Sequence, residues 1–528
     1  MLVLQNISYS HLNKELLFSD ISLTVQNHEK VALIGNNGSG KSTLLKIIAG
    51  DLSPSGGFMS VESVPYFVPQ IFGQFNHLSI AQALGIDGKL AALKDILDGS
   101  TTEANFNMLN NDWTVEVRCA EALNYWQLEG LNLSDKMEAL SGGQKTRVFL
   151  AGIQIYQPDL VLLDEPSNHL DIPGREILYD FIESARCALL VVSHDRKLLN
   201  MMERVCELSS EGIKVYGGIY DFYKEQKLIE NNALSQDIQS REKALRKARE
   251  KERETLERQQ RSDNRGKAKQ VKSGVARIMM NTLRNNAENS TSKLKSVHAE
   301  KIEGITRELL DLRSSLPEVD RMKIGFDNSA LHRGKVLFKA NDINFAYGSS
   351  PVWTDNLTMQ IVSGERIALK GRNGSGKTTL INLITGKAEP GTGSVYRSEN
   401  KAVYVDQDYS LLDNRLSVYE QAQQFNIAAL QEHEVKIRLS RFLFSKNDWD
   451  KSCGTLSGGE RMRLMLCCLT IYSKSPDILV FDEPTNNLDI QNVEILTAAI
   501  NEYQGTLIVV SHDETFIEQI GIDRIIEL

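Results

Sequence analysis

Residues 35–42 read Gly35-Asn-Asn-Gly-Ser-Gly-Lys41-Ser42, and residues 371–378 repeat them as Gly371-Arg-Asn-Gly-Ser-Gly-Lys377-Thr378. Each copy follows a short apolar run and precedes a second apolar run. A glycine-rich turn between a strand and a helix lets backbone N–H groups face phosphate oxygens, and the helix dipole adds to the attraction. The two stretches therefore predict two phosphate-binding loops in an α/β fold.

Three further motifs recur in the same order after each loop. Leu140-Ser-Gly-Gly-Gln144 recurs as Leu456-Ser-Gly-Gly-Glu460, LLDEPSNHLD at 162–171 recurs as VFDEPTNNLD at 480–489, and VVSHD occurs at 191–195 and at 509–513. Self-similarity of this kind predicts tandem domains. We place the first at residues 1–218 and the second at residues 336–528.

The spacing between the copies changes at one place. The offset falls from 337 residues at Gln70 and Gln407 to 316 residues at the next motif. The first copy thus carries about 21 additional residues, which we assign to a short arm at about 80–115.

The segment between the copies, 219–335, has a different composition. Residues 221–310 lack proline and are rich in Lys, Arg, Glu and Gln, which favours helix. Gly266 and Gly274 are interpreted as breaks between two helices, and Pro317 as the stop of the second. The prediction is a helical hairpin with a reach of about 60–75 Å.

The charge of this linker is opposite to that of the remaining chain. Residues 241–295 hold 17 Lys and Arg against 7 Asp and Glu, while the whole chain has a net charge of −9. A basic projection on acidic domains is typical of a nucleic-acid contact, whereas the alternative is a solvated coiled coil. The residues assigned to this contact are Arg261, Arg265, Lys267, Lys269, Lys272 and Arg277.

Catalytic groups are expected after the apolar runs 160–164 and 478–482. Asp164 and Asp482 end these strands and suit Mg²⁺, together with the loop residues Ser42 and Thr378. Glu165 and Glu483 follow at the turn, where a carboxylate can act as general base toward an attacking water.

These blocks, in this order, resemble the ATP-binding cassette superfamily. The resemblance implies that each ATP site is shared. The serine of the Leu-Ser-Gly-Gly signature motif, Ser141 or Ser457, would face the γ-phosphate held by the other cassette. It also implies that Gln70 and Gln407 contact Mg²⁺, that Asp171 and Asp489 link the sites, and that His194 and His512 act beside the glutamates. Both sites look complete, so both are expected to hydrolyse ATP.

The expected ATP contacts in the first cassette are Gly35, Asn36, Asn37, Gly38, Ser39, Gly40, Lys41, Ser42, Thr43, Gln70, Ser141, Gly142, Gly143, Gln144 and Asp171. Those in the second are Tyr347, Gly371, Arg372, Asn373, Gly374, Ser375, Gly376, Lys377, Thr378, Thr379, Gln407, Ser457, Gly458, Gly459, Glu460 and Asp489. Tyr347 fits the aromatic residue that stacks on adenine. In the first copy His11 matches it by alignment, and Tyr9 nearby serves either the core or the base.

Three kinds of cassette protein share these motifs and differ in what surrounds them. A transporter ATPase needs no basic hairpin between fused cassettes, and DNA-repair cassette ATPases insert their coils inside a cassette. The layout resembles the ABC-F family of ribosome-associated factors, as does Tyr216-Gly-Gly-Ile-Tyr-Asp-Phe-Tyr223 at the linker entry.

The ABC-F resemblance implies a monomer in the cytoplasm that closes on ATP, binds the ribosomal E site and points its linker toward P-site tRNA and rRNA. A housekeeping role in translation and antibiotic resistance by ribosome protection both stay open. The apolar residues Ile278, Met279, Met280 and Leu283 could contact tRNA or pack the two linker helices together.

Composition agrees with a cytosolic chain without a membrane domain. No apolar stretch approaches the length of a membrane span, and the N-terminus lacks a signal-peptide pattern. The six cysteines form no CxxC pair and are expected to be reduced structural thiols.

Overall fold

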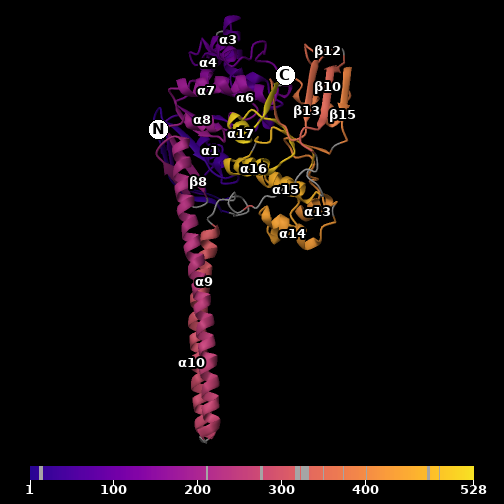
Figure 1. Cartoon of the computed structure of the whole chain (residues 1–528). Helices are drawn as coiled ribbons and strands as arrows, with labels where there is room; N and C mark the ends of the chain where they lie inside the picture. The colour runs from indigo at the N-terminus through magenta and orange to yellow at the C-terminus, as the bar shows by residue number, and fades with distance from the viewer. Residues whose placement is uncertain are drawn as a thin grey trace. The chain divides into compact units, whose positions relative to one another are not determined.

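The structure is a computed structural model of the chain (Figure 1). It describes residues 1–10, 16–100, 102–209, 212–273, 277–314, 322, 332–348, 350–372, 374–399, 401–427, 429–472, 476–486 and 488–528. Within the linker helices, the side chains at 259, 263, 266–292, 294 and 295 lie outside the description. By internal contacts the chain divides into two compact units, Met1–Tyr223 with Met322–Leu528, and Lys224–Arg321.

The first cassette is built on two sheets. An antiparallel sheet has the order β2-β1-β4, with β1 Leu2–Ser10, β2 Leu16–Val25 and β4 Gly56–Val61. A mainly parallel sheet has the order β5-β6-β7-β3-β8-β9, with β3 Lys30–Ile34, β5 Tyr66–Val68, β6 Leu160–Asp164, β7 Ala188–Val192, β8 Arg204–Ser209 and β9 Gly212–Tyr216. Among the described strands of this second sheet, β8 and β9 form the antiparallel pair.

The helices of the first cassette fall into three groups along the chain. The loop helix is α1, Lys41–Ala49. Between Gln70 and Ser141 lie η1 Gly73–Phe75, α2 Ile80–Leu84, α3 Asp87–Leu97, α4 Glu103–Leu109, α5 Val115–Tyr125 and η2 Met137–Ala139. The motif helices are α6 Gly142–Tyr156, α7 Ile172–Ser184 and α8 Arg196–Asn200.

The second cassette repeats this plan. Its antiparallel sheet is β13-β10-β15, and its parallel sheet is β16-β17-β18-β14-β19. The strands are β10 Val336–Asn344, β11 Ala346–Tyr347, β12 Ser350–Pro351, β13 Leu357–Val362, β14 Arg366–Lys370, β15 Thr392–Arg397, β16 Ala402–Val405, β17 Ile478–Asp482, β18 Thr506–Val510 and β19 Arg524–Glu527. The helices are α12 Lys377–Thr385, α13 Val418–Gln424, α14 Glu432–Arg441, η3 Lys446–Asp448, η4 Cys453–Thr455, α15 Gly458–Ile471, α16 Ile490–Glu502 and α17 Glu514–Gln519.

The central strands explain why the motifs lie together. β6 and β7 are buried at every residue, as expected for parallel strands covered on both faces. β3 pairs with β7, and β7 pairs with β6, all parallel. Their carboxyl ends therefore meet at one edge, where the phosphate loop, Asp164–Glu165 and the VVSHD segment follow them.

The linker consists of two long antiparallel helices, α9 Tyr220–Ser273 and α10 Arg277–Ser314 (Figure 1). Arg241 of α9 lies 3.1 Å from Glu308 of α10, and Glu242 lies 2.5 Å from Arg313. At 54 residues, α9 is about 80 Å long. The predicted class, two tandem cassettes joined by a helical hairpin, is confirmed.

One predicted detail of the linker is wrong. The sequence predicts a helix break at Gly266, but α9 continues through it to Ser273. A glycine costs a helix interior only about 1 kcal/mol relative to alanine, which a long helix full of good helix formers can absorb. Gly274 and Pro317 lie outside the described residues.

Candidate active site

Both phosphate loops end in a glycine that no larger residue could replace without strain. Gly40 and Gly376 precede α1 and α12 with φ of 96° and 91°, in the left-handed region. A Cβ on Gly40 would lie 2.7 Å from the Phe18 ring, and one on Gly376 would lie 2.5 Å from Val352. The sequence therefore needs glycine here to bring the loop tightly into the helix.

Each loop holds its lysine by backbone carbonyls. The Lys41 Nζ donates to the carbonyl oxygens of Gly35 at 2.7 Å and Asn36 at 3.0 Å. Lys377 Nζ donates to those of Gly371 at 2.8 Å and Arg372 at 3.0 Å. Burial lowers the pKa of both lysines, while nearby carboxylates oppose the shift. The two loops thus present the same arrangement in both cassettes.

The residues expected at Mg²⁺ fit that ion. Burial raises the pKa of Asp164 and Asp482, and the neighbouring hydroxyls of Ser42 and Thr378 oppose that shift. Asp164 Oδ1 is buried without a hydrogen-bond partner, which leaves an oxygen for a cation. Among the described residues, no three acidic, His or Cys side chains form a metal cage. Mg²⁺ held by one or two protein oxygens plus phosphates matches this donor set.

The two glutamates leave their strands in an unusual conformation. Glu165 has φ of 51° and Glu483 has φ of 48°, both left-handed, which is uncommon for a residue with a side chain. Their backbone N–H groups donate to Val192 and Val510 at 2.8 Å. This turn places each carboxylate beside the histidine of the VVSHD segment rather than along the strand.

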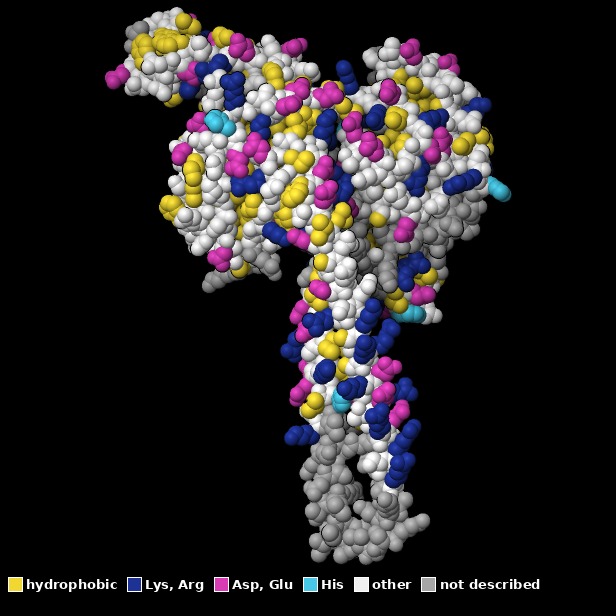
Figure 2. All heavy atoms as spheres, turned by 60° about the vertical axis from the view of Figure 1, so that its left-hand side comes forward, with side chains coloured by type: hydrophobic (Ala, Val, Ile, Leu, Met, Phe, Trp, Pro, Cys, Tyr) yellow, Lys and Arg dark blue, Asp and Glu magenta, His cyan; other side chains and the backbone are white. Residues whose placement is uncertain are grey.

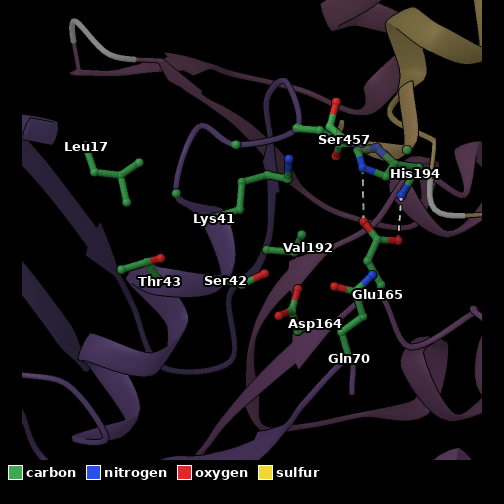
Figure 3. Close-up of a pocket in the computed structure, with 14 residues that line it drawn as sticks. Leu17, Lys41, Ser42, Thr43, Gln70, Asp164, Glu165, Val192, His194 and Ser457 are labelled. Carbon is green, nitrogen blue, oxygen red and sulfur yellow. Dashed lines mark hydrogen bonds and ion pairs between the residues drawn. The ribbon is translucent and has the colours of Figure 1, made fainter. Parts of the chain in front are cut away.

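Figure 3 shows the resulting pair in the first cassette. Glu165 Oε2 accepts from the backbone N–H of His194 at 3.3 Å, and Oε1 lies 3.2 Å from His194 Nε2. The second cassette has the same pair, with 3.4 Å from the His512 N–H to Oε2 of Glu483 and 3.3 Å from its Nε2 to Oε1. The predicted catalytic residues are therefore adjacent within each cassette.

Burial governs the ionisation of these pairs. Burial, together with the neighbouring Asp164 carboxylate, raises the pKa of Glu165 to about 8. It raises the pKa of Glu483 to about 7, although Arg175 opposes the shift. Burial lowers the pKa of His194 to about 3 and that of His512 to about 4. Both imidazoles are therefore neutral near pH 7.

The cavity at the first phosphate loop, of about 400 Å³, combines residues of both cassettes (Figure 3). From the first cassette come Leu17, Asn37, Gly38, Gly40, Lys41, Ser42, Thr43, Gln70, Asp164, Glu165, Val192 and His194; from the second come Ser457 and Gly458. The Asn37 N–H also donates to Asp489 Oδ2 of the second cassette at 2.8 Å.

The cavity at the second phosphate loop has two adjoining parts that share Gln407 and Glu483. The larger part, about 730 Å³, holds the loop residues Gly374, Gly376, Lys377, Thr378 and Thr379 with Tyr347, Tyr404 and Asp482. The smaller part, about 200 Å³, holds Ser141, Gly142, Gly143, His169 and Arg175 of the first cassette with His512.

The signature serines begin helices. Ser141 and Ser457 are the N-caps of α6 and α15, each in a reciprocal capping box with the residue three positions later. The boxes differ in charge. Gln144 accepts from the Ser141 N–H at 2.9 Å, whereas the Glu460 carboxylate accepts from both the Ser457 N–H at 2.8 Å and the Ser457 hydroxyl at 2.7 Å.

The aromatic residues do not match between cassettes. Tyr347 lines the second cavity, is 68% exposed, and shares a hydrogen bond with Thr379. Tyr9 packs beside Phe18, with ring centroids 6.3 Å apart, against the sheet core. Leu17 lines the first cavity, and no motif in the sequence pointed to it. His11 and Asn373 lie outside the described residues.

The predicted nucleic-acid contacts are described only in part. Arg261 and Arg265 are exposed on α9. The side chains of Lys267, Lys269, Lys272, Arg277, Ile278, Met279, Met280 and Leu283 lie outside the description. Figure 2 shows Lys and Arg side chains along the described part of the linker, with acidic side chains among them.

Within the described residues, no helix is long and apolar enough to cross a membrane. All six cysteines are free, and five are buried.

Comparison with known proteins places both cassettes in one family. The family model described as ABC transporter matches residues 18–168 and 354–486. The chain is 30% identical to the putative ATP-binding protein YdiF of Bacillus subtilis (strain 168), covering 100% of this chain and 80% of that protein. It is 30% identical to the probable ATP-binding protein YbiT of Escherichia coli O157:H7, covering 100% and 96%. It is 29% identical to ABC transporter F family member 5 of Arabidopsis thaliana, covering 99% and 74%.

Solved structures agree on the fold. The RNase-L inhibitor matches with a TM-score of 0.59 at 20% identity, covering 99% of this chain and 87% of that one. An archaeal ribosome recycling factor, in complex with a ribosomal stalk protein, matches with the same score, identity and coverage. The chain belongs to the ATP-binding cassette family described as ABC transporter, and within it to the tandem ATPases of the ABC-F type.

Proposed function

We propose that this ATPase is an ATP-gated ribosome-binding factor. Its cassettes close on two ATP molecules, the closed form occupies the ribosomal E site with the linker toward P-site tRNA, and hydrolysis releases it. The observation that carries the proposal is that the first cavity contains both the Lys41 loop and Ser457, which belong to different cassettes. A ligand gripped from both sides shifts the cassettes toward closure, because it gains contacts that the open form cannot make.

The chemistry of hydrolysis is assigned to groups that recur in both sites. Lys41 and Lys377 would bind the β- and γ-phosphates, and Mg²⁺ held by Ser42–Asp164 or Thr378–Asp482 would offset their negative charge. Glu165 or Glu483, each beside a neutral histidine, would orient and deprotonate the attacking water. Loss of the γ-phosphate would remove the contact to the signature serine and let the cassettes part.

The proposed partner is ribosomal RNA and tRNA. Support comes from the charge of the linker, since 17 basic against 7 acidic residues over 241–295 suits a phosphate backbone. Further support is that a solved structure with this fold is a ribosome recycling factor. RNA recognition by shape and phosphate contacts needs no sequence-specific motif in the linker.

Two roles fit such a factor. It could serve translation on stalled or initiating ribosomes, or it could protect the ribosome from antibiotics, as its long linker and short arm suggest. Inhibitory concentrations of drugs that target the peptidyl-transferase centre, measured in cells with and without the protein, separate these roles. Inhibitory concentrations that do not change with the protein argue for the translation role.

Ribosome co-sedimentation of the Glu165→Gln/Glu483→Gln variant tests the ribosomal proposal directly. The variant should bind ATP without hydrolysing it, so we expect it to pellet with ribosomes in ATP but not in ADP. Pelleting should weaken between about 50 and 200 mM salt, because phosphate contacts release counterions. A variant that binds ATP and stays in the supernatant at both salt concentrations contradicts the proposal.

The first site should respond to a change at its signature. Glu460→Gln removes the carboxylate that accepts a hydrogen bond from the Ser457 hydroxyl, and so leaves that hydroxyl more available to the γ-phosphate. We expect turnover at the first site to rise about two- to fivefold, the size of a partly exposed charge effect. Steady-state phosphate release in the Glu483→Gln background measures it, with Gln144→Glu as the mirror change in the Glu165→Gln background. A fall in turnover on Glu460→Gln would contradict the charge argument.

A further inference from the structure

Arg175 of α7 connects the first cassette to the catalytic segment of the second. Its Nη1 donates to the carbonyl oxygen of His512 at 3.4 Å, and its Nε donates to the carbonyl oxygen of Leu170 at 3.2 Å. The same side chain is 13% exposed and lies 3.7 Å from Asp195. Arg175 also lines the small cavity that contains Glu483. A partly buried cation of one cassette therefore lies at the candidate active site of the other.

The guanidinium is held in place before any ligand arrives. Asp195 N-caps α8 and accepts a hydrogen bond from the Tyr179 hydroxyl at 2.6 Å. Tyr179 and Arg175 lie four residues apart on α7, so both reach the same carboxylate. With Leu170 and Asp195 on the same guanidinium, its direction toward His512 is fixed within its own cassette.

The second cassette offers no equivalent group to the first site within the described residues. Aligning Leu170-Asp171 with Leu488-Asp489 puts Val493 at the position of Arg175, and Val493 is a buried aliphatic residue. The described lining of the first cavity takes Ser457 and Gly458 from the second cassette and includes no arginine. The motifs are repeated, but the cation supplied across the cassette boundary is not.

We infer that Arg175 is a positioning residue for the second ATP site and makes it the faster of the two. It fixes the backbone of His512, whose N–H in turn contacts Glu483, and it adds positive charge where the γ-phosphate and the catalytic carboxylate meet. A preorganised positive charge stabilises the negative charge that develops during phosphoryl transfer. This inference rests on the ATPase activity of the cassettes and is independent of ribosome binding.

The test isolates each site with a glutamate variant and then removes Arg175. Glu165→Gln leaves the second site to turn over ATP, and Glu483→Gln leaves the first. We expect Arg175→Ala to lower kcat about tenfold in the Glu165→Gln background and less than about twofold in the other. KM should change little, because the loop from Gly371 to Thr379 is untouched. Arg175→Lys keeps the charge but not the forked geometry, so its kcat in the Glu165→Gln background should lie between those of Arg175 and Arg175→Ala.

Arg196→Ala is the matched control. Arg196 is a second arginine that the first cassette directs at the other cassette, 3.8 Å from Glu494 on α16, but it lines neither cavity. Arg196→Ala should weaken closure of the cassettes and lower kcat by the same factor in both glutamate backgrounds. An Arg175→Ala variant that behaves like this control, or that changes neither background, overturns the inference. The assay measures ATP turnover without ribosomes. A result that overturns the role of Arg175 therefore leaves the ribosomal proposal standing.

Discussion

Replacing Glu165 and Glu483 together by glutamine is expected to lower ATP turnover about 10³-fold while ATP binding persists. A positioned general base contributes about 10²–10⁴ to a hydrolysis rate, and glutamine cannot take the proton of water. The amide keeps the size of the carboxyl and can still accept from the N–H groups of His194 and His512. Phosphate release measures turnover, and equilibrium binding of ATP to the same preparation measures the retained affinity.

Glu29→Gln/Glu365→Gln is the matched control for this experiment. These two glutamates stand at equivalent places before β3 and β14, and each forms an ion pair at 2.9 Å with an arginine, Arg204 or Arg524. Neither lines a nucleotide cavity. The control should therefore keep its turnover within about twofold, since these partly exposed ion pairs lie outside the cavities and such pairs contribute little. If the active-site variant also stays within about tenfold of the parent, neither glutamate acts as the base.

The parts of the site that follow from the sequence are those fixed by local backbone. A glycine-rich turn between a buried strand and a helix has one geometry, so residues 35–42 and 371–378 can be assigned to phosphate from the sequence alone. The position of the Glu165 side chain is harder to predict from the sequence. Its left-handed backbone comes from the hydrogen bond of its N–H to Val192 on a neighbouring strand, and sequence distance hides that pairing.

Other parts depend on contacts between the cassettes and leave no pattern in a single chain. Arg175 is one basic residue near the start of a helix, and nothing in its neighbours marks it as part of a site 337 residues away. Leu17 is similarly hidden, because it looks like any strand residue of a half-buried sheet. Gly266 shows the opposite error, since a residue that breaks short helices is absorbed by a 54-residue helix.

The basic segment of the linker should control affinity for the ribosome. Replacing Arg261, Arg265, Lys267 and Lys269 by glutamine removes four positive charges while keeping good helix formers. We expect ribosome affinity at about 150 mM salt to fall by about 10²–10³, because each lost phosphate contact also removes a released counterion. The slope of log affinity against log salt should become shallower by about three units for the same reason.

The control removes the same charge from another part of the hairpin. Arg241, Arg253, Arg307 and Arg313 each pair with a glutamate at 2.5 to 3.2 Å, so their charge is already partly offset. Changing these four to glutamine alters the net charge of the chain by the same amount, yet should weaken ribosome binding much less.

Equal losses of ribosome affinity in both variants would mean that the overall field of the hairpin, and not contact at residues 261–269, attracts the ribosome. No loss in either would contradict an RNA contact by this linker, since four phosphate contacts cannot be removed without a change in salt dependence. Basal ATP turnover without ribosomes should stay unchanged in both, because the described lining of the cavities includes none of these side chains.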